Sequence, residues 1–208
     1  MKRCVIAGGA KIADYARIQG MLKAEDYFIC CDSGYRHSVA LGRKPDLIVG
    51  DFDSSENPHL DVETIVLPCE KDDTDTVYAV KEAVARGFEE FLLIGVCGGR
   101  LDHTLGNVSI LLYLDSIGKK GTIVDDYSEM EVISTQTALV EDRYPFFSLL
   151  NVTGCAEGIT IRNAKYPLEN GVITTEYQYG ISNEVLPGKQ AEISVAKGKL
   201  LLIKVERE

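Results

Sequence analysis

Short apolar runs alternate with helical patterns through residues 1–125 of this 208-residue chain, and this alternation limits the fold more than any other feature. The runs are continuously apolar or β-branched, as expected for strands that are buried on both faces. They are followed closely by Gly, Asp or Pro and comprise residues 3–7, 27–31, 46–50, 64–67 and 91–96. We therefore expect an α/β N-terminal domain with a mostly parallel, Rossmann-like sheet that helices cover.

Two helices are expected between or after these runs. Apolar residues recur at the spacing of one helix face in residues 74–86 and again in residues 101–117, and Gly118 follows the second pattern as a C-terminal stop. The expected apolar stripe of the second helix comprises Leu101, Leu105, Val108 and Leu112.

From about Asp126 onward the pattern is β-rich, with short segments separated by turn residues and no helical period after Lys120. This predicts an all-β C-terminal sandwich domain over residues 126–208. Within it, residues 191–205 resemble a hairpin that turns at Lys197 and Gly198.

The charge balance excludes several classes of protein. Asp and Glu number 32 against 22 Lys and Arg, a formal net charge of −10. A nucleic-acid binder needs a basic face that displaces counterions, and an anionic membrane surface attracts clustered Lys and Arg. With no apolar run near the ~18 residues of a membrane helix and no signal peptide pattern, we expect a cytoplasmic protein. Its six cysteines show no CxxC spacing, so reduced thiols are expected rather than a zinc site.

Acidic residues follow the expected strands. These residues are Asp32 after the second run, Asp51 and Asp53 after the third, Asp72, Asp73 and Asp75 after the fourth, and Asp102 after the fifth. Because ligands of open α/β sheets bind beyond the carboxyl ends of the strands, we expect these turns to converge on one rim. Any one such Asp can instead be a helix cap or turn former, and Asp32 and Asp75 are the best candidates for that role.

Converging carboxylates require a cation. Two of them ~4 Å apart repel by about 4 kcal/mol at an effective dielectric near 20. Oxygen ligands with little nearby His or Cys favour Mg²⁺ over Zn²⁺, and Mg²⁺ usually completes its shell with water and substrate phosphates. Gly98 and Gly99 form a turn able to approach a phosphate closely, Arg100 lies beside it, and Lys71 could serve similarly.

Four motifs together resemble the thiamine pyrophosphokinase family. They are GDFDS at 50–54, KDDTDT at 71–76, GGRLDH at 98–103 and GISNE at 180–184. The resemblance implies pyrophosphoryl transfer from ATP to the hydroxyl of thiamine, giving thiamine diphosphate and AMP, with Mg²⁺ as cofactor. It also implies that residues 1–125 bind the nucleotide and carry catalysis, and that residues 126–208 bind thiamine and dimerise. The implied homodimer has active sites between the α/β domain of one subunit and the β domain of the other.

The resemblance also implies roles for individual residues. Asp51, Asp72 and Asp102 would hold Mg²⁺ or orient the reacting hydroxyl, and Arg100 would meet phosphate oxygens. The expected supporting residues on the nucleotide side are Lys71, Asp73 and Asp75, and those that match the family's thiamine-binding stretch are Ser182 and Asn183. Because the chain has no Trp, an aromatic wall against thiamine would come from Tyr or Phe, with Tyr177 and Tyr179 as candidates.

Two other functions compete with this one. The segment LIVGDFDSS also resembles the strand and DxDx[ST] motif of an aspartyl-nucleophile phosphohydrolase, in which Asp51 would be the nucleophile and free phosphate a product. That chemistry does not account for the RLDH turn or the β-rich half. The second alternative is a non-catalytic protein that binds thiamine or a nucleotide in the same cleft.

Overall fold

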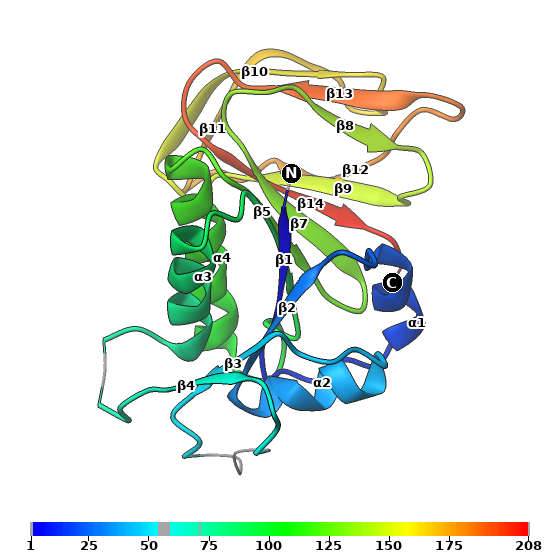
Figure 1. Cartoon of the computed structure of the whole chain (residues 1–208). Coiled ribbons are helices and arrows are strands. Elements are labelled where there is room, and N and C mark those ends of the chain that lie inside the picture. The colour runs from blue at the N-terminus through cyan, green and yellow to red at the C-terminus, as the bar shows by residue number, and fades with distance from the viewer. Residues whose placement is uncertain (1, 54–58, 71, 208) are drawn as a thin grey trace. The chain divides into compact units, whose positions relative to one another are not determined.

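The computed structural model of the chain describes residues 2–53, 59–70 and 72–207. The chain divides into two compact units, Met1–Asp126 and Tyr127–Glu208. The helices and strands of the first unit are β1 (Arg3–Ala7), α1 (Tyr15–Met21), β2 (Tyr27–Cys31), the 3₁₀ turn η1 (Asp32–Gly34), α2 (Tyr35–Ala40), β3 (Leu47–Gly50), β4 (Glu63–Val66), α3 (Asp75–Ala85), β5 (Glu90–Ile94), α4 (Leu101–Ser116) and β6 (Lys120–Val124) (Figure 1).

The strands of the first unit form a parallel sheet. In spatial order they are β6, β5, β1, β2, β3 and β4, and every neighbouring pair is parallel. The chain winds outward from β1 to β4 and then resumes on the other side of β1 with β5 and β6. Figure 1 shows α1 and α2 on one face of this sheet, with α3 and α4 side by side on the other. The direction of winding therefore reverses between β1 and β5, where open α/β sheets bind their ligands.

The central strands are apolar because both of their faces are covered. Val5, Phe28 and Ile48 have no exposed surface and belong to one cluster that β1, β2 and β3 share. On β6, a Cβ at Gly121 would lie 2.7 Å from a Leu114 methyl, so the missing side chain lets α4 approach the strand closely. The prediction of helix-covered, buried strands in this half of the chain is confirmed.

The predicted apolar stripe of α4 is wrong, because none of its four residues is among the buried residues of the helix. Leu101 and Leu105 are 70% and 62% exposed. The residues of α4 that are buried are Asn107, Ile110, Leu111 and Leu114. The part of α4 that packs on the sheet lies farther along the helix, where Leu111 and Leu114 lie against Gly121 of β6.

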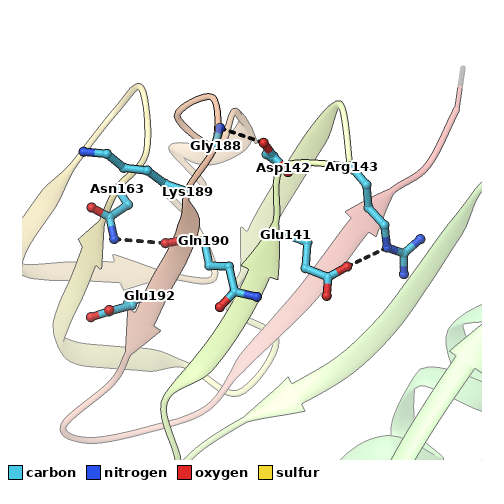
Figure 2. A pocket seen from close by; sticks show the side chains of 8 residues that line it. All are labelled: Glu141, Asp142, Arg143, Asn163, Gly188, Lys189, Gln190 and Glu192. Atoms are coloured by element: carbon cyan, nitrogen blue, oxygen red, sulfur yellow. Dashed lines mark hydrogen bonds and ion pairs between the residues drawn. The ribbon is translucent and has the colours of Figure 1, made fainter.

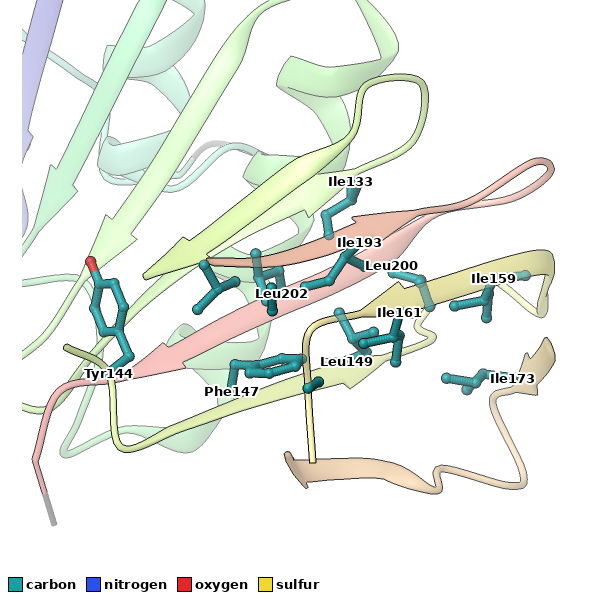
Figure 3. Packing of buried hydrophobic residues seen from close by; sticks show 14 residues of the cluster. Ile133, Tyr144, Phe147, Leu149, Ile159, Ile161, Ile173, Ile193, Leu200 and Leu202 are labelled. Carbon is teal, nitrogen blue, oxygen red and sulfur yellow. The ribbon is translucent and has the colours of Figure 1, made fainter. Parts of the chain in front are cut away.

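The second unit contains two antiparallel sheets. Their strands are β7 (Ser128–Ile133), β8 (Ala138–Glu141), β9 (Phe146–Leu150), β10 (Cys155–Arg162), β11 (Leu168–Thr174), β12 (Gly180–Asn183), β13 (Gln190–Ser194) and β14 (Leu200–Val205). Within this unit, β12, β9, β14 and β7 are neighbours in one sheet, and β11, β10, β13 and β8 in the other. Side chains of both sheets, among them Phe147, Leu149, Ile161 and Ile193, form one buried cluster (Figure 3). The expected all-β second half is confirmed, and the described residues after Ser116 include no helix.

The predicted hairpin over residues 191–205 is wrong. Strand β13 pairs with β10 and β8, whereas β14 pairs with β7 and β9, so the chain passes from one sheet to the other. The turn faces β10 instead, where Lys197 N donates to Glu157 O at 3.1 Å. A Cβ at Gly198 would lie 2.4 Å from Cys155 O, so this approach requires glycine.

Membrane-spanning helices are absent from residues 2–53, 59–70 and 72–207, where no helix combines the length and the apolar character that a crossing demands.

Candidate active site

The carboxyl ends of β1 and β5 come very close together at the point where the winding reverses. Gly8 N donates to Ile94 O at 2.9 Å, and Ala10 N donates to Gly95 O at 2.7 Å. A Cβ at Gly8 would lie 2.7 Å from Gly95 O, and Gly95 has φ +60°. Only glycine fits at Gly8 and Gly95, and a Cβ at Gly9 would lie 2.3 Å from Ser33 Oγ, which explains the glycine pair after the first strand.

A buried histidine lies beneath these two loops. His37 of α2 is 1% exposed, with Nε2 2.8 Å from Ala10 O and Nδ1 2.8 Å from the Tyr15 hydroxyl. Burial lowers its pKa, Ala10 O acts in the opposite sense, and nearby Arg36 lowers the pKa further. Sequence reasoning did not select His37, because a lone histidine carries no spacing signal.

Asp32 and Phe52 hold unusual backbone conformations at neighbouring strand ends. Asp32 follows β2 with φ 45°, and Phe52, between Asp51 and Asp53, has φ 54°. Asp32 is the first residue of η1, whose N-cap position is Cys31, so Asp32 stands within this turn rather than at its cap position. Non-glycine residues with positive φ are costly and concentrate at functional sites. Asp32 therefore joins Asp51 as a candidate site residue.

The acids after β4 differ in their surroundings. Asp72 is exposed, while the Asp73 carboxylate accepts from Lys81 Nζ at 2.6 Å. The N-cap of α3 is Thr74, whose hydroxyl accepts from Val77 N at 3.3 Å. The expectation that Asp75 caps this helix is therefore wrong, since Asp75 is its first residue. Lys71 lies outside the described residues.

Arg100 and Asp102 form a two-bonded ion pair at the start of α4. Arg100 Nε donates to Asp102 Oδ1 at 3.1 Å and Nη2 to Oδ2 at 2.5 Å, with both side chains more than half exposed. Hydrogen bonding from Arg100 lowers the Asp102 pKa to about 2. Gly98 and Gly99 have φ +96° and +71°, a conformation that places Arg100 beside the helix start. As paired here, Asp102 is a stable anion and a poor proton acceptor.

The acids are not gathered into a ready-made metal site. In the part of the chain that the structure describes, no three or more His, Cys, Asp and Glu side chains lie close enough to hold an ion. The assignment of Asp51, Asp72 and Asp102 to magnesium stays a prediction. Their oxygen donors suit Mg²⁺, which proteins usually bind through one or two carboxylates together with substrate phosphates.

In the second unit, the two residues predicted to bind thiamine have different environments. Ser182 on β12 is exposed with φ 57°, and its N–H donates to Ser148 Oγ at 3.1 Å. Asn183 is 5% exposed, and its side-chain amide bonds both main-chain groups of Tyr166. Tyr166 N donates to Asn183 Oδ1 at 3.0 Å, and Asn183 Nδ2 donates to Tyr166 O at 2.8 Å. Glu184 N also donates to Asn183 Oδ1. Asn183 therefore fixes the backbone beside Ser182 and has little capacity left for a ligand.

Tyr177 and Tyr179 lie immediately before β12. Their ring centroids are 5.3 Å apart, and the rings are 69% and 41% exposed. The Tyr179 hydroxyl donates to Val172 O at 2.7 Å, which fixes one ring. The exposed pair precedes Ser182 by five and three residues in the chain and stays a candidate for the aromatic wall against thiamine.

Two hollows lie away from these residues. One of about 610 Å³ in the second unit is lined by charged and polar side chains including Glu141, Arg143 and Lys189 (Figure 2). Asp142 accepts from Gly188 N at 2.7 Å, which ties together the two loops that border it. The other, of about 250 Å³, lies along α3 and α4. No residue predicted for the site lines either of them.

A parallel sheet with acidic loops at its carboxyl edge, followed by an antiparallel β sandwich, defines a two-unit protein with an α/β part and an all-β part. The family model described as thiamin pyrophosphokinase, catalytic domain, matches residues 18–123, and the one described as thiamin pyrophosphokinase, vitamin B1 binding domain, matches residues 133–200. The chain belongs to the thiamin pyrophosphokinase family, so the resemblance seen in its motifs is confirmed.

Individual relatives agree with this assignment. The chain is 28% identical to a thiamine pyrophosphokinase of Bacillus subtilis (strain 168), over 96% of each chain. A solved thiamin pyrophosphokinase from Geobacillus thermodenitrificans has 28% identity and a TM-score of 0.84, with 99% of this chain and 97% of that one covered. A solved Bacillus subtilis thiamine pyrophosphokinase has 23% identity and a TM-score of 0.89 over 100% of both chains, which shows the common fold.

Proposed function

We propose that the protein transfers the pyrophosphoryl group of ATP to the hydroxyl of thiamine, giving thiamine diphosphate and AMP. One observation carries the proposal: the catalytic match falls on the unit with the acidic strand ends, and the vitamin B1 binding match on the unit with Ser182 and the tyrosine pair. We place the nucleotide where the Rossmann-like sheet reverses its winding, beyond β1 and β5.

Magnesium is the proposed cofactor, held by ATP phosphates and by carboxylates among Asp51, Asp72 and Asp102. When bound, it would neutralise charge on the phosphoryl oxygens. A site that the nucleotide completes needs fewer protein ligands than one that the protein builds alone. Asp73 and Lys71 are proposed to assist nucleotide binding, and Asp75 to support Asp72 from the start of α3.

Arg100 is proposed to exchange partners when ATP binds. A guanidinium fork that bonds a carboxylate through two N–H groups also matches the oxygens of a phosphate. As Arg100 turns to phosphate, Asp102 loses the partner that holds its pKa near 2. Asp102 then becomes a better acceptor for the thiamine hydroxyl proton, with Asp72 as the other candidate.

Thiamine is proposed to bind to the second unit beside Ser182, with Tyr177 and Tyr179 against its rings. Thiamine is cationic, so a chain with a net charge of −10 favours its approach. A homodimer is proposed from the family resemblance, and light scattering of the purified chain tests it.

The decisive experiment incubates the protein with ATP, Mg²⁺ and thiamine and quantifies AMP, thiamine diphosphate and inorganic phosphate. We expect AMP and thiamine diphosphate in equal amounts and no reaction when EDTA removes the metal. Release of phosphate without AMP would support the aspartyl-nucleophile hydrolase instead, and binding without any product would support the non-catalytic alternative. Asp51→Asn should abolish turnover while the far-ultraviolet circular dichroism stays that of the wild type.

A further inference from the structure

His37 joins three segments of the first unit that are distant in sequence. It lies on α2, bonds Ala10 in the loop after β1, and bonds Tyr15, the first residue of α1. It also lies directly against Gly95, where an added Cβ would be 3.0 Å from its Cδ2 and Nε2 atoms. The ring therefore supports both loops that meet where the sheet reverses its winding.

The contacts determine which ring nitrogen carries the proton. Ala10 O can only accept, so Nε2 of His37 donates to it. In the neutral ring Nδ1 then has no hydrogen and accepts from the Tyr15 hydroxyl. Burial lowers the pKa of His37 and so favours this neutral form. The result is a directed chain of hydrogen bonds from Tyr15 through His37 to the carbonyl of Ala10.

Ala10 is held on both sides by these bonds. Its N–H donates to Gly95 O, and its carbonyl accepts from His37. Hydrogen bonds thus hold residues 8–10 just beyond the carboxyl ends of β1 and β5, and the chemistry proposed above uses neither Tyr15 nor His37.

We infer that Tyr15 and His37 are positioning residues for the nucleotide, which hold the turn of residues 8–10 in the conformation that accepts ATP. The inference rests on the proposed function and adds to it a second layer of residues beneath the nucleotide. Tyr15 and His37 act through main-chain groups of the proposed nucleotide site. Loss of their hydrogen bonds should therefore weaken ATP binding and leave thiamine binding unchanged.

Tyr15→Phe and a matched control provide the test. Tyr15→Phe removes the hydroxyl that bonds His37 and keeps the ring. Tyr27→Phe is the control, because the Tyr27 hydroxyl accepts from Arg86 Nη1 at 2.9 Å at the start of β2, on the opposite edge of the sheet. Both tyrosines are partly buried. Each substitution removes one hydrogen bond worth about 0.5–1.5 kcal/mol, equivalent to a factor of about 2–13.

His37 is tested by two further variants. His37→Leu keeps much of the side-chain volume and leaves Ala10 O without its donor, whereas the amide of His37→Gln can restore a donor near the place of Nε2. Each variant is measured for the KM of ATP, the KM of thiamine, kcat, and the folded fraction by circular dichroism.

We expect Tyr15→Phe to raise the KM of ATP about threefold or more, with the KM of thiamine within twofold of wild type and Tyr27→Phe unchanged in both. His37→Leu should raise the KM of ATP further, and His37→Gln should recover part of the loss. Equal ATP constants in Tyr15→Phe and Tyr27→Phe would overturn the inference, as would ATP and thiamine constants that rise together. If His37→Leu does not fold, Tyr15→Phe against Tyr27→Phe still decides. A wild-type protein that forms no AMP would overturn the proposed function itself. An active wild type whose KM of ATP is unchanged by Tyr15→Phe would overturn only this inference.

Discussion

Asn107→Ala tests how α4 holds the loop that leads to Arg100 and Asp102. The Asn107 side chain is 7% exposed, and its Nδ2 donates to Val96 O at 2.7 Å. Val96 is itself 4% exposed, so water does not easily replace the lost donor. Leaving a buried carbonyl without its partner costs about 1–3 kcal/mol. Alanine returns about 0.5 kcal/mol through its better helix propensity, so we expect a net loss of about 0.5–2.5 kcal/mol.

Helical circular dichroism is the appropriate assay, because every helix in the described residues belongs to the first unit. For a chain of this size, 1 kcal/mol corresponds to about 2–4 °C in Tm, so the helical signal should melt about 1–10 °C lower. Ser109→Ala, at an exposed position of the same helix, is the control and should stay within about 0.5 kcal/mol of wild type. If the two variants melt together, the bond to Val96 contributes nothing and the reasoning fails.

Three further substitutions test other parts of the structure. Asp26→Asn breaks the ion pair with Arg3, whose Nη2 lies 2.6 Å from Asp26 Oδ2, and should cost on the order of 3 kcal/mol by urea unfolding. Burial opposes ionisation of Asp26, but the hydrogen bonds from Arg3 outweigh it and lower the pKa of Asp26. The wild type should therefore lose stability as the pH falls below about 4, and Asp26→Asn should lose less. Parallel pH profiles of the two proteins would contradict this. Asn183→Ala releases Tyr166 and should raise the KM of thiamine more than that of ATP, a split that would vanish if the amide only stabilises the fold. Phe147→Ala removes a fully buried ring from the core of the second unit and should lower the free energy of unfolding by about 3–5 kcal/mol. A change near zero in urea unfolding would refute the packing argument.

Much of the first unit could be predicted because its strands are buried on both faces. Strands β1 and β2 fall on the predicted ranges, since each apolar run stops at a Gly or Asp that cannot continue it. The prediction did not include α1 and α2, which are only 7 and 6 residues long and too short to show a helical period.

The second unit was harder because pairing depends on contacts between distant residues. Strands β13 and β14 are adjacent in sequence and flank a Lys-Gly turn, which indicates a hairpin when only local signals are considered. The structure pairs them with different sheets because Ile193 and Leu202 contribute from opposite sides to one buried core. No local signal distinguishes a tight hairpin turn from a crossover between sheets.

At the candidate site, the sequence could identify residue types but not their pairing. An Asp after a buried strand predicts an acidic rim, and an Arg beside two glycines predicts a phosphate contact. The structure shows that Arg100 and Asp102 form an ion pair with each other, because Gly98 and Gly99, both with positive φ, place the guanidinium beside the carboxylate.

A pair of this kind keeps two opposite charges in place until a stronger anion competes for the arginine. Phosphates carry more charge than one carboxylate and fit the same fork, so in the mechanism proposed above the arriving nucleotide would take Arg100 from Asp102. Activation of the base would then depend on ATP being bound, and thiamine alone would meet an aspartate that is still held by its arginine.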